Sequence, residues 1–337
     1  MKPSSTTFSR RQFLTMTASA SLMLAGGIGL AHSRAEAAPV SVTRLLMGSI
    51  ANLTIIGSDH AHAQAAIAAA FDRMQSLEAV FSRFSEHSQL SQLNRDGSVS
   101  DPHPAFVEVL KRAVAYGQLT DGAFDVTIES VHKLYRQATQ TGSLPGVEAV
   151  EAARQHVDYQ AIEIDDTGVR LKRAGMAVTL DGIAKGYIID QGAAVLKEYG
   201  YDNLLVELGG DLSAHGRPES RPWQISIRQP GGSGQALVAQ LSSRALATSG
   251  DYLNTFTADR RLNHILDPES GVSPLELASA SVLAPTAGDA DALATALMVM
   301  GRGAGLRLAE RLDGIEALVI TKSGEIQQTA GFPLRDL

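Results

Sequence analysis

The oxygen-bearing side chains of Asp291 and Thr295 are the clearest candidates for metal chemistry in the sequence. The two residues are four positions apart in a stretch that predicts a helix over residues 289–300, so both side chains lie on one helix face. A carboxylate and a hydroxyl placed in this way can offer two hard oxygen atoms to one Mg²⁺ ion. The alternative is that Asp291, together with Asp289, only complements the positive end of the helix dipole.

A second candidate is the turn at residues 179–186. There, a predicted strand over residues 176–180 runs into Asp181 and Gly182 and then into a helix. Glycine lets backbone groups approach a ligand closely. The start of a helix favours a phosphate, and Lys185 adds a positive charge at that point. The alternative is an ordinary turn in which Asp181 caps the helix.

His264 is the candidate proton acceptor. It lies in the segment HILDPESG, residues 264–271, where a predicted strand ends in a turn at Asp267 and Pro268. A histidine can accept a proton near neutral pH, which suits a reaction in which a hydroxyl group attacks phosphorus. The alternative is a surface histidine, or one whose hydrogen bonds are satisfied in the core.

The elements that must position these residues read as a mixture of long helices and antiparallel strands. Helices are predicted over residues 60–84, 104–119, 145–157, 186–199 and 289–300. Strands are predicted over residues 41–47, 50–56, 162–171 (a hairpin), 203–208, 223–228, 236–241, 277–283, 315–321 and 325–329. Residues 85–102 read as a loop with a short helical turn. We therefore expect an α+β fold with mixed sheets rather than a doubly wound sheet.

Composition excludes several classes of function. The chain has 29 basic and 36 acidic residues, and its first 37 residues hold four of the former and one of the latter, so the remainder has a net charge near −10. With no basic stripe, this argues against nucleic-acid binding. The sequence contains no cysteine, which excludes disulfides, thiolate metal sites and cysteine nucleophiles. No Walker-type phosphate loop occurs, and the glycine cluster at residues 231–234 reads as a hairpin loop.

The first 37 residues read as a targeting segment. Residues 9–14, SRRQFL, form a twin-arginine signature. A weakly apolar stretch over residues 14–31 is too broken for a membrane span, and residues 35–37 form an A-x-A cleavage site. We expect export by the twin-arginine translocase and a periplasmic mature chain of residues 38–337 without a membrane span. The alternative is an uncleaved anchor.

Short motifs along the chain carry a family resemblance. They are SRF (82–84), SQLSQLN (88–94), GAFD (122–125), TLDGIAKGY (179–187), ELGGD (207–211), ATSGDY (247–252), HILDPESG (264–271) and DADALATA (289–296). With these motifs the chain resembles the ApbE family, the FAD:protein FMN transferases, from about residue 42 to the C-terminus. The resemblance implies a compact, two-lobed α+β fold with the flavin site between the lobes.

The resemblance also implies which residues contact a metal and FAD. Asp291 and Thr295 would bind Mg²⁺ together with the carbonyl of Gly182, phosphate and water. Phe84 would stack on the isoalloxazine ring, or else it packs in the core. The remaining implied FAD contacts are Met47, Ala123, Phe124, Asp125, Thr179, Asp181, Lys185, His264 and Ile265. Many family members carry Asp at the position of Thr179, and here Asp181 follows two residues later, so either residue could make the polar contact.

The reaction that the resemblance implies is transfer of FMN from FAD to a Thr or Ser hydroxyl of a partner protein, with release of AMP. Mg²⁺ and Lys185 would neutralise the phosphate, and His264 would accept the proton. The alternatives are a Mg²⁺-dependent FAD pyrophosphatase, a non-catalytic flavin-binding protein and an accessory factor without chemistry. The partner would be a periplasm-facing flavoprotein. Twin-arginine export without a lipid anchor resembles the NosX branch, which serves the membrane flavoprotein NosR.

Overall fold

The computed structural model describes residues 38–230, 237–252 and 254–335, and its centre is an eight-stranded sheet. All neighbouring strands in this sheet run antiparallel, in the order β1-β2-β6-β7-β10-β11-β12-β13. The strands are β1 Ala38–Leu46, β2 Ser49–Gly57, β6 Leu204–Leu208, β7 Asp211–His215, β10 Arg244–Gly250, β11 Leu277–Ala284, β12 Glu316–Thr321 and β13 Ile326–Gln328. The predicted leader and the glycine cluster at 231–234 lie outside the described residues.

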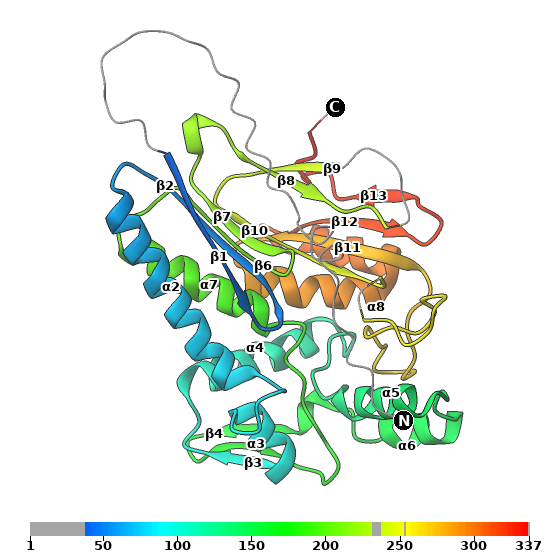
Figure 1. The fold of residues 1–337 in the computed structure, drawn as a ribbon. Coiled ribbons are helices and arrows are strands. Elements are labelled where there is room, and N and C mark those ends of the chain that lie inside the picture. Colours follow the sequence, from blue (N-terminus) through cyan, green and yellow to red (C-terminus); the bar gives the residue numbers. More distant parts are fainter. Residues whose placement is uncertain (1–37, 231–236, 253, 336–337) are drawn as a thin grey trace, which may run out of the picture.

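Helices cover one face of the sheet, and a hairpin covers part of the other (Figure 1). Helices α2 (His60–Phe81), α7 (Ala184–Glu198) and α8 (Ala287–Arg311) lie along one face. The hairpin of β8 (Trp223–Ile227) and β9 (Leu237–Leu241) packs on the other face through a separate hydrophobic cluster. All of β11 is buried as a result, which explains why its sequence reads as a continuous apolar and small-residue run.

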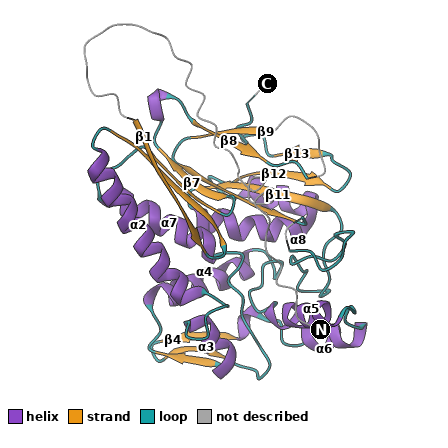
Figure 2. Ribbon diagram, in the orientation of Figure 1, coloured by secondary structure: helices purple, strands orange, loops and turns teal. Residues whose placement is uncertain are grey.

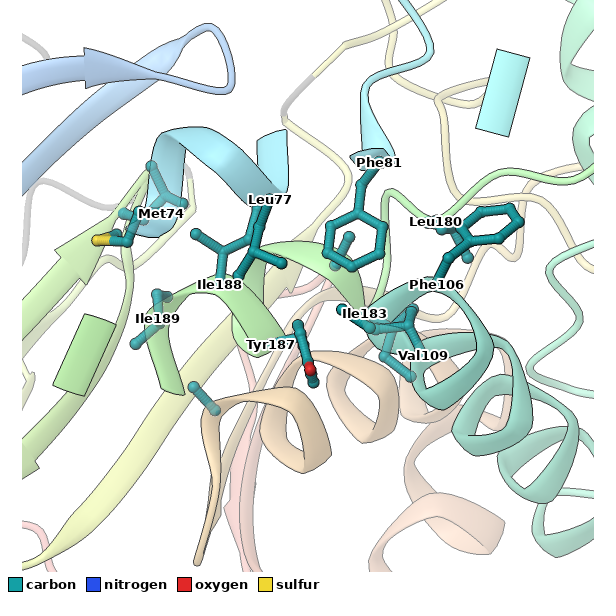
Figure 3. Packing of buried hydrophobic residues seen from close by; sticks show 14 of the residues in the cluster. Met74, Leu77, Phe81, Phe106, Val109, Leu180, Ile183, Tyr187, Ile188 and Ile189 are labelled. Carbon is teal, nitrogen blue, oxygen red and sulfur yellow. The ribbon is translucent and has the colours of Figure 1, made fainter. Parts of the chain in front are cut away.

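A second region is built from short strands and helices, below the large sheet in Figure 2. Its elements are α3 Gln89–Asp96, β3 Ser98–Ser100, α4 Pro104–Leu119, α5 Glu129–Thr141, α6 Val147–Arg154, β4 Ile162–Asp165 and β5 Gly168–Leu171. One hydrophobic cluster runs from the large sheet through α2 and α7 into α4 and β5, so the two regions share a core. Figure 3 shows the part of this cluster around α7, where Phe81 and Tyr187 meet edge to face at 5.8 Å.

The predicted α+β class is confirmed, as are the hairpins at residues 41–56 and 162–171 and the pairing of β8 with β9. Several local predictions are wrong. Residues 176–180 form no strand and make only an isolated bridge at Ala177, and residues 85–102 contain α3 and β3. Helix α5 was not predicted, because its sequence is mostly polar and its few apolar residues, including Val131 and Tyr135, pack on α6 and a loop rather than on the sheet.

Helix boundaries also differ from the predictions. Helix α2 ends at Phe81, since Ser82 is already extended with φ −67° and ψ 121°. Helix α8 continues to Arg311 through a kink at Gly301, where φ is 72°. Glycine adopts this left-handed conformation without a Cβ penalty, so the predicted helix at 289–300 corresponds to the segment before the kink. Among the described residues, no helix combines the length and the apolarity that crossing a bilayer requires.

A candidate metal and phosphate site at the start of α7

The turn before α7 is held by backbone contacts rather than by a strand. The N–H of Thr179 donates to the carbonyl of Val126 at 2.8 Å, and the N–H of Asp181 donates to the Thr179 hydroxyl at 3.2 Å. Ile183 occupies the N-cap position, and its own side chain makes no capping hydrogen bond. The alternative in which Asp181 caps this helix is therefore wrong. The N–H of Ala184 donates instead to the carbonyl of Leu180 at 2.8 Å.

Helices α7 and α8 cross closely at their first turns. The carboxylate of Asp190, on α7, accepts from the N–H groups of Ala287 and Gly288 at 2.8 and 2.9 Å. A Cβ atom on Gly186 would lie 2.1 Å from the carbonyl oxygen of Ala287, so only glycine fits at the crossing. This close approach brings the first turn of α7 to Asp291, whose carboxylate accepts from the N–H of Gly186 at 3.2 Å.

The predicted metal-binding pair lies at this crossing. Asp291 is 4% exposed and faces α7, whereas Asp289 points elsewhere and accepts from the hydroxyl of Tyr116 at 2.7 Å. The Thr295 hydroxyl lies 3.2 Å from that of Ser249 on β10. It would also lie 3.0 Å from a Cβ built on Gly182, so Gly182 lies beside the helix face that carries Asp291 and Thr295.

Asp211 is a site residue that the sequence reasoning missed. Gly209 and Gly210 form the two-residue turn between β6 and β7 with φ values of 63° and 103°, a turn that favours glycine. The turn leaves Asp211 at the start of β7, 2% exposed, where it pairs with the ammonium group of Lys185 and accepts from the N–H of Thr248 at 3.0 Å. The feature of the sequence that could have indicated Asp211 was its place in the ELGGD motif.

The charges of this group do not balance among themselves. Burial would lower the pKa of Lys185, but the carboxylates of Asp211 and Asp291 raise it above its usual value, so Lys185 is protonated. Burial, reinforced by Asp211 and opposed by Lys185, raises the pKa of Asp291 to about 7. When Asp291 is ionised, two buried carboxylates lie beside one ammonium group, and a divalent cation would offset the excess negative charge.

Hard oxygen donors dominate the group. No three His, Cys, Asp or Glu side chains converge on a metal position in the described part of the chain. A metal at Asp291 would therefore take its further ligands from the Thr295 hydroxyl, the Gly182 carbonyl and a bound substrate. Oxygen ligands with few carboxylates are typical of Mg²⁺ sites that also bind phosphate.

Phe84 is not a core residue. Its side chain is 79% exposed, which contradicts the alternative of core packing. The guanidinium of Arg83 lies 4.4 Å from the ring centroid, and it pairs with Asp181 at 3.0 Å. Arg83 therefore connects the Phe84 ring to the turn before α7, where it forms a salt bridge with the carboxylate of Asp181.

The GAFD segment lies beside the same turn. The Phe124 ring, 4% exposed, would approach a Cβ on Gly182 to 3.2 Å. Ala123 belongs to the preceding turn, where its N–H donates to the carbonyl of Thr120 at 3.1 Å. The carboxylate of Asp125 accepts from the N–H groups of Thr127 and Tyr159 at 2.8 and 2.9 Å. Phe124 can thus contact a ligand at the turn, whereas Asp125 holds the loop.

Met47 lies at the same end of the large sheet. It is half-buried in the turn between β1 and β2, and its N–H donates to the carboxylate of Glu78 at 2.8 Å. The N–H of Gly209 donates to the carbonyl of Ile50 at 3.0 Å, so this turn adjoins the turn that carries Asp211.

His264 lies on the loop between β10 and β11, and the strand predicted before it does not form. Its N–H donates to the carbonyl of Asn254 at 3.0 Å, and its carbonyl accepts from Nε2 of His132 at 2.7 Å. Ile265 is 4% exposed and packs with α8 and β11, while Leu266 packs with α5 and α6. None of these contacts joins the His264 ring to Asp291.

The same loop borders a hollow of about 380 Å³. Its lining residues are Leu144, Thr257, Asp259, Arg261, Leu262, Val272, Ser273 and Leu275. Leu144 and Leu275 are each about half exposed. The hollow shares no lining residue with the group around Asp291, so the two are separate features of the surface.

The fold and the site define an α+β protein with a polar centre suited to a phosphate and a hard cation. The chain belongs to the ApbE family, whose model matches residues 47–319. It is 32% identical over 274 residues to the FAD:protein FMN transferase of Haemophilus influenzae, covering 76% of this chain and 79% of that protein. It is 29% identical over 332 residues to the FAD:protein FMN transferase of Treponema pallidum, covering 91% of each.

Solved structures agree with this assignment. The ApbE protein of Thermotoga maritima superimposes with a TM-score of 0.79 at 28% identity, covering 87% of this chain and 97% of that one. The flavin transferase ApbE of Vibrio cholerae superimposes with a TM-score of 0.74 at 28% identity and the same coverage.

Proposed function

We propose that this chain transfers FMN from FAD to a Thr or Ser hydroxyl of a partner protein and releases AMP. Its relatives named FAD:protein FMN transferase match it over most of their length. The observation that carries the proposal is the convergence of Lys185, Asp291 and Thr295 at the start of α7. A helix start, an ammonium group and hard oxygen atoms are the parts that phosphoryl transfer requires.

Mg²⁺ fits this group of residues. Asp291, Thr295 and the carbonyl of Gly182 would hold the ion, because Gly182 lies close to the Thr295 hydroxyl and Asp291 shares the helix face of Thr295. When bound, the ion would neutralise charge on the transferred phosphate. Lys185 and the positive end of the α7 helix dipole would hold the phosphate in place.

The transfer step exchanges one bond at phosphorus for another. The acceptor hydroxyl oxygen bonds to the FMN phosphorus while the bond from that phosphorus to the AMP oxygen breaks. AMP leaves with the electron pair of the broken bond, and the hydroxyl proton passes to the imidazole of His264. The product is a phosphoester that joins FMN to the partner protein.

The flavin would lie beside Phe84, Met47 and the segment 123–125. The exposed ring of Phe84 is available for stacking, and Arg83 and Asp181 connect it to the phosphate end of the site. Asp181 pairs with Arg83 through one carboxylate oxygen, and the Thr179 hydroxyl accepts from the N–H of Asp181, so both residues would shape the turn. The Thr179 hydroxyl can still donate and the Asp181 carboxylate can still accept, so either could contact FAD.

An assay with three possible outcomes tests the proposal. The protein is incubated with FAD, Mg²⁺ and the flavin domain of a NosR-like protein, and the denatured acceptor is examined for flavin fluorescence. We expect a fluorescent acceptor, with AMP formed in equal amount, and no label when the acceptor Thr or Ser is replaced by Ala. Free FMN and AMP without label would identify a pyrophosphatase, and unchanged FAD would identify a binding protein.

We also propose periplasmic action after twin-arginine export, with a periplasm-facing flavoprotein as acceptor. The support is the SRRQFL segment and the A-x-A sequence at residues 35–37. Replacing Arg10 and Arg11 together by Lys should leave an uncleaved precursor in the cytoplasm. Normal periplasmic accumulation of this double variant would contradict the proposal.

A further inference from the structure

The loop that carries His264 has no strand or helix, so individual contacts must fix its backbone. The N–H of His264 donates to the carbonyl of Asn254 at 3.0 Å, and the N–H of Ile265 donates to Oδ1 of Asn263 at 2.9 Å. The Ser273 hydroxyl in turn bonds to the N–H and the carbonyl of Asn263 at 2.9 and 3.0 Å. All these partners belong to the same loop. They fix its shape but not its place against the rest of the molecule.

One side chain from outside the loop bonds to its central residue. Nε2 of His132 lies 2.7 Å from the carbonyl oxygen of His264. Since a carbonyl oxygen can only accept, Nε2 carries the hydrogen and donates it. His132 is on α5, 132 positions earlier in the sequence, and its side chain is only 11% exposed. In Figure 1 the yellow loop between β10 and β11 extends from the α8 region toward α5.

Glu129, one turn earlier on α5, lies near the other ring nitrogen of His132. One carboxylate oxygen of Glu129 lies 3.7 Å from Nδ1 of His132, and the other pairs with Arg136. Burial would raise the pKa of Glu129, but His132 and Arg136 lower it below its usual value, so the carboxylate is charged. At 3.7 Å this contact is too long for a hydrogen bond, so the bond from Nε2 to the His264 carbonyl is the directional contact of the ring.

We propose that His132 is a positioning residue: its hydrogen bond to the His264 carbonyl fixes the loop against α5 and so places the imidazole of His264. This rests on the proposed function, because the placement affects turnover only if His264 acts in the transfer. Apolar contacts also attach the loop to α5, such as the Tyr135 ring stacked on Phe256 at 5.2 Å. A hydrogen bond adds direction, which stacking alone lacks.

Two variants of His132 and one matched control test this role. His132→Leu removes the donor, His132→Gln keeps an N–H donor, and Lys133→Leu changes the exposed neighbour on the same helix. For each, thermal melting checks the fold, and hydrogen exchange of peptides covering residues 254–266 reports the loop without any substrate. FAD affinity, the KM for FAD and kcat are measured with the flavin domain of a NosR-like protein as acceptor.

We expect His132→Leu to exchange at least about fivefold faster in the loop, as the loss of one buried hydrogen bond implies. Its kcat should fall about 10- to 100-fold with the KM for FAD within about twofold, the signature of a misplaced catalytic group. His132→Gln should recover most of both properties, and Lys133→Leu should match the unmodified protein.

Each negative result contradicts a different part of the proposal. Unchanged hydrogen exchange in a folded His132→Leu protein would show that the hydrogen bond does not fix the loop. Faster hydrogen exchange with unchanged kcat would show that His132 does not position His264 for the reaction. Equal losses in His132→Leu and His132→Gln would assign the effect to ring packing instead of the hydrogen bond. Absence of transfer by the unmodified protein would refute the proposed function, while the exchange experiment would still measure the bond.

Discussion

The group around Asp291 and the loop around His264 are supported in opposite ways. Lys185, Asp211 and Asp291 each lie in the first turn or two of a helix, or at the first residue of a strand. The crossing of α7 and α8 and the hairpin of β6 and β7 therefore set their relative positions. His264 lies on neither a helix nor a strand, and side chains such as His132 and Asn263 hold the backbone around it.

The two regions should therefore respond differently to substitution. In the Asp291 group, positions follow from helix packing, so a substitution that respects the packing should alter only chemistry. In the His264 loop, single hydrogen bonds add to the packing of Ile265 and Leu266, so substitutions away from the chemistry should alter turnover.

Asp291→Ala should have the largest effect. It removes the carboxylate that we propose as the main metal ligand, so transfer should fall at least about 10³-fold. The melting temperature at neutral pH should not fall much, because burial raises the pKa of Asp291 and its ionised form therefore opposes folding above the pKa of the unfolded chain. Flavin labelling of the acceptor and thermal melting measure the two effects.

Asp289→Asn is the matched control for Asp291→Ala. Asp289 is two residues away, and its carboxylate accepts from the hydroxyl of Tyr116, a role that Asn can keep. We expect near-normal transfer of FMN by this variant. We also expect the unmodified protein to lose transfer when EDTA removes the metal. Similar activity in the two variants, or full activity in EDTA, would refute the metal assignment.

His264→Ala should reduce transfer by at least about 10²-fold, the usual effect of losing a general base. FAD affinity should stay near normal, because the proposed role is toward the acceptor hydroxyl. Comparing FAD titration with single-turnover labelling in the same variant separates the two effects. A loss of affinity that accounts for the whole loss of rate would make His264 a binding residue.

Gly186→Ala tests whether helix packing places the Asp291 group. Its Cβ would lie 2.1 Å from the Ala287 carbonyl, so the helices must separate. We expect a loss of about 1–3 kcal/mol in the free energy of unfolding, together with weaker transfer. In Gly303→Ala the nearest atom lies 3.5 Å away, in Arg307, so this helical control should gain about 0.5–1 kcal/mol. Denaturant unfolding that ranks the two variants alike would contradict this account.

Phe84→Ala should weaken FAD binding by about 1–3 kcal/mol, by analogy with the stacking of bases on aromatic rings. Because the side chain is 79% exposed, the free energy of unfolding should change by less than about 0.5 kcal/mol. Leu45→Ala, at a residue that is 74% exposed on β1, serves as the control for loss of an exposed apolar side chain. Unchanged FAD affinity in Phe84→Ala would remove Phe84 from the flavin site.

The sequence by itself determined the features that depend on short separations. The four-residue spacing of Asp291 and Thr295 places them on one helix face, and residues 162–171 form the expected hairpin. Helical and strand periodicities repeat over a few residues, so they can be read without knowing how the chain crosses itself. The order of the motifs was enough for the family, which the comparisons confirm.

Only the tertiary structure decided which distant residues meet. Lys185 pairs with Asp211, 26 positions away, and Gly186 donates to Asp291, 105 positions away, because α7, β7 and α8 converge at one end of the sheet. Helix α5, which was not predicted, supplies the bond from His132 to His264. Such contacts depend on the packing of whole elements, whereas sequence patterns report only which face of each element is apolar.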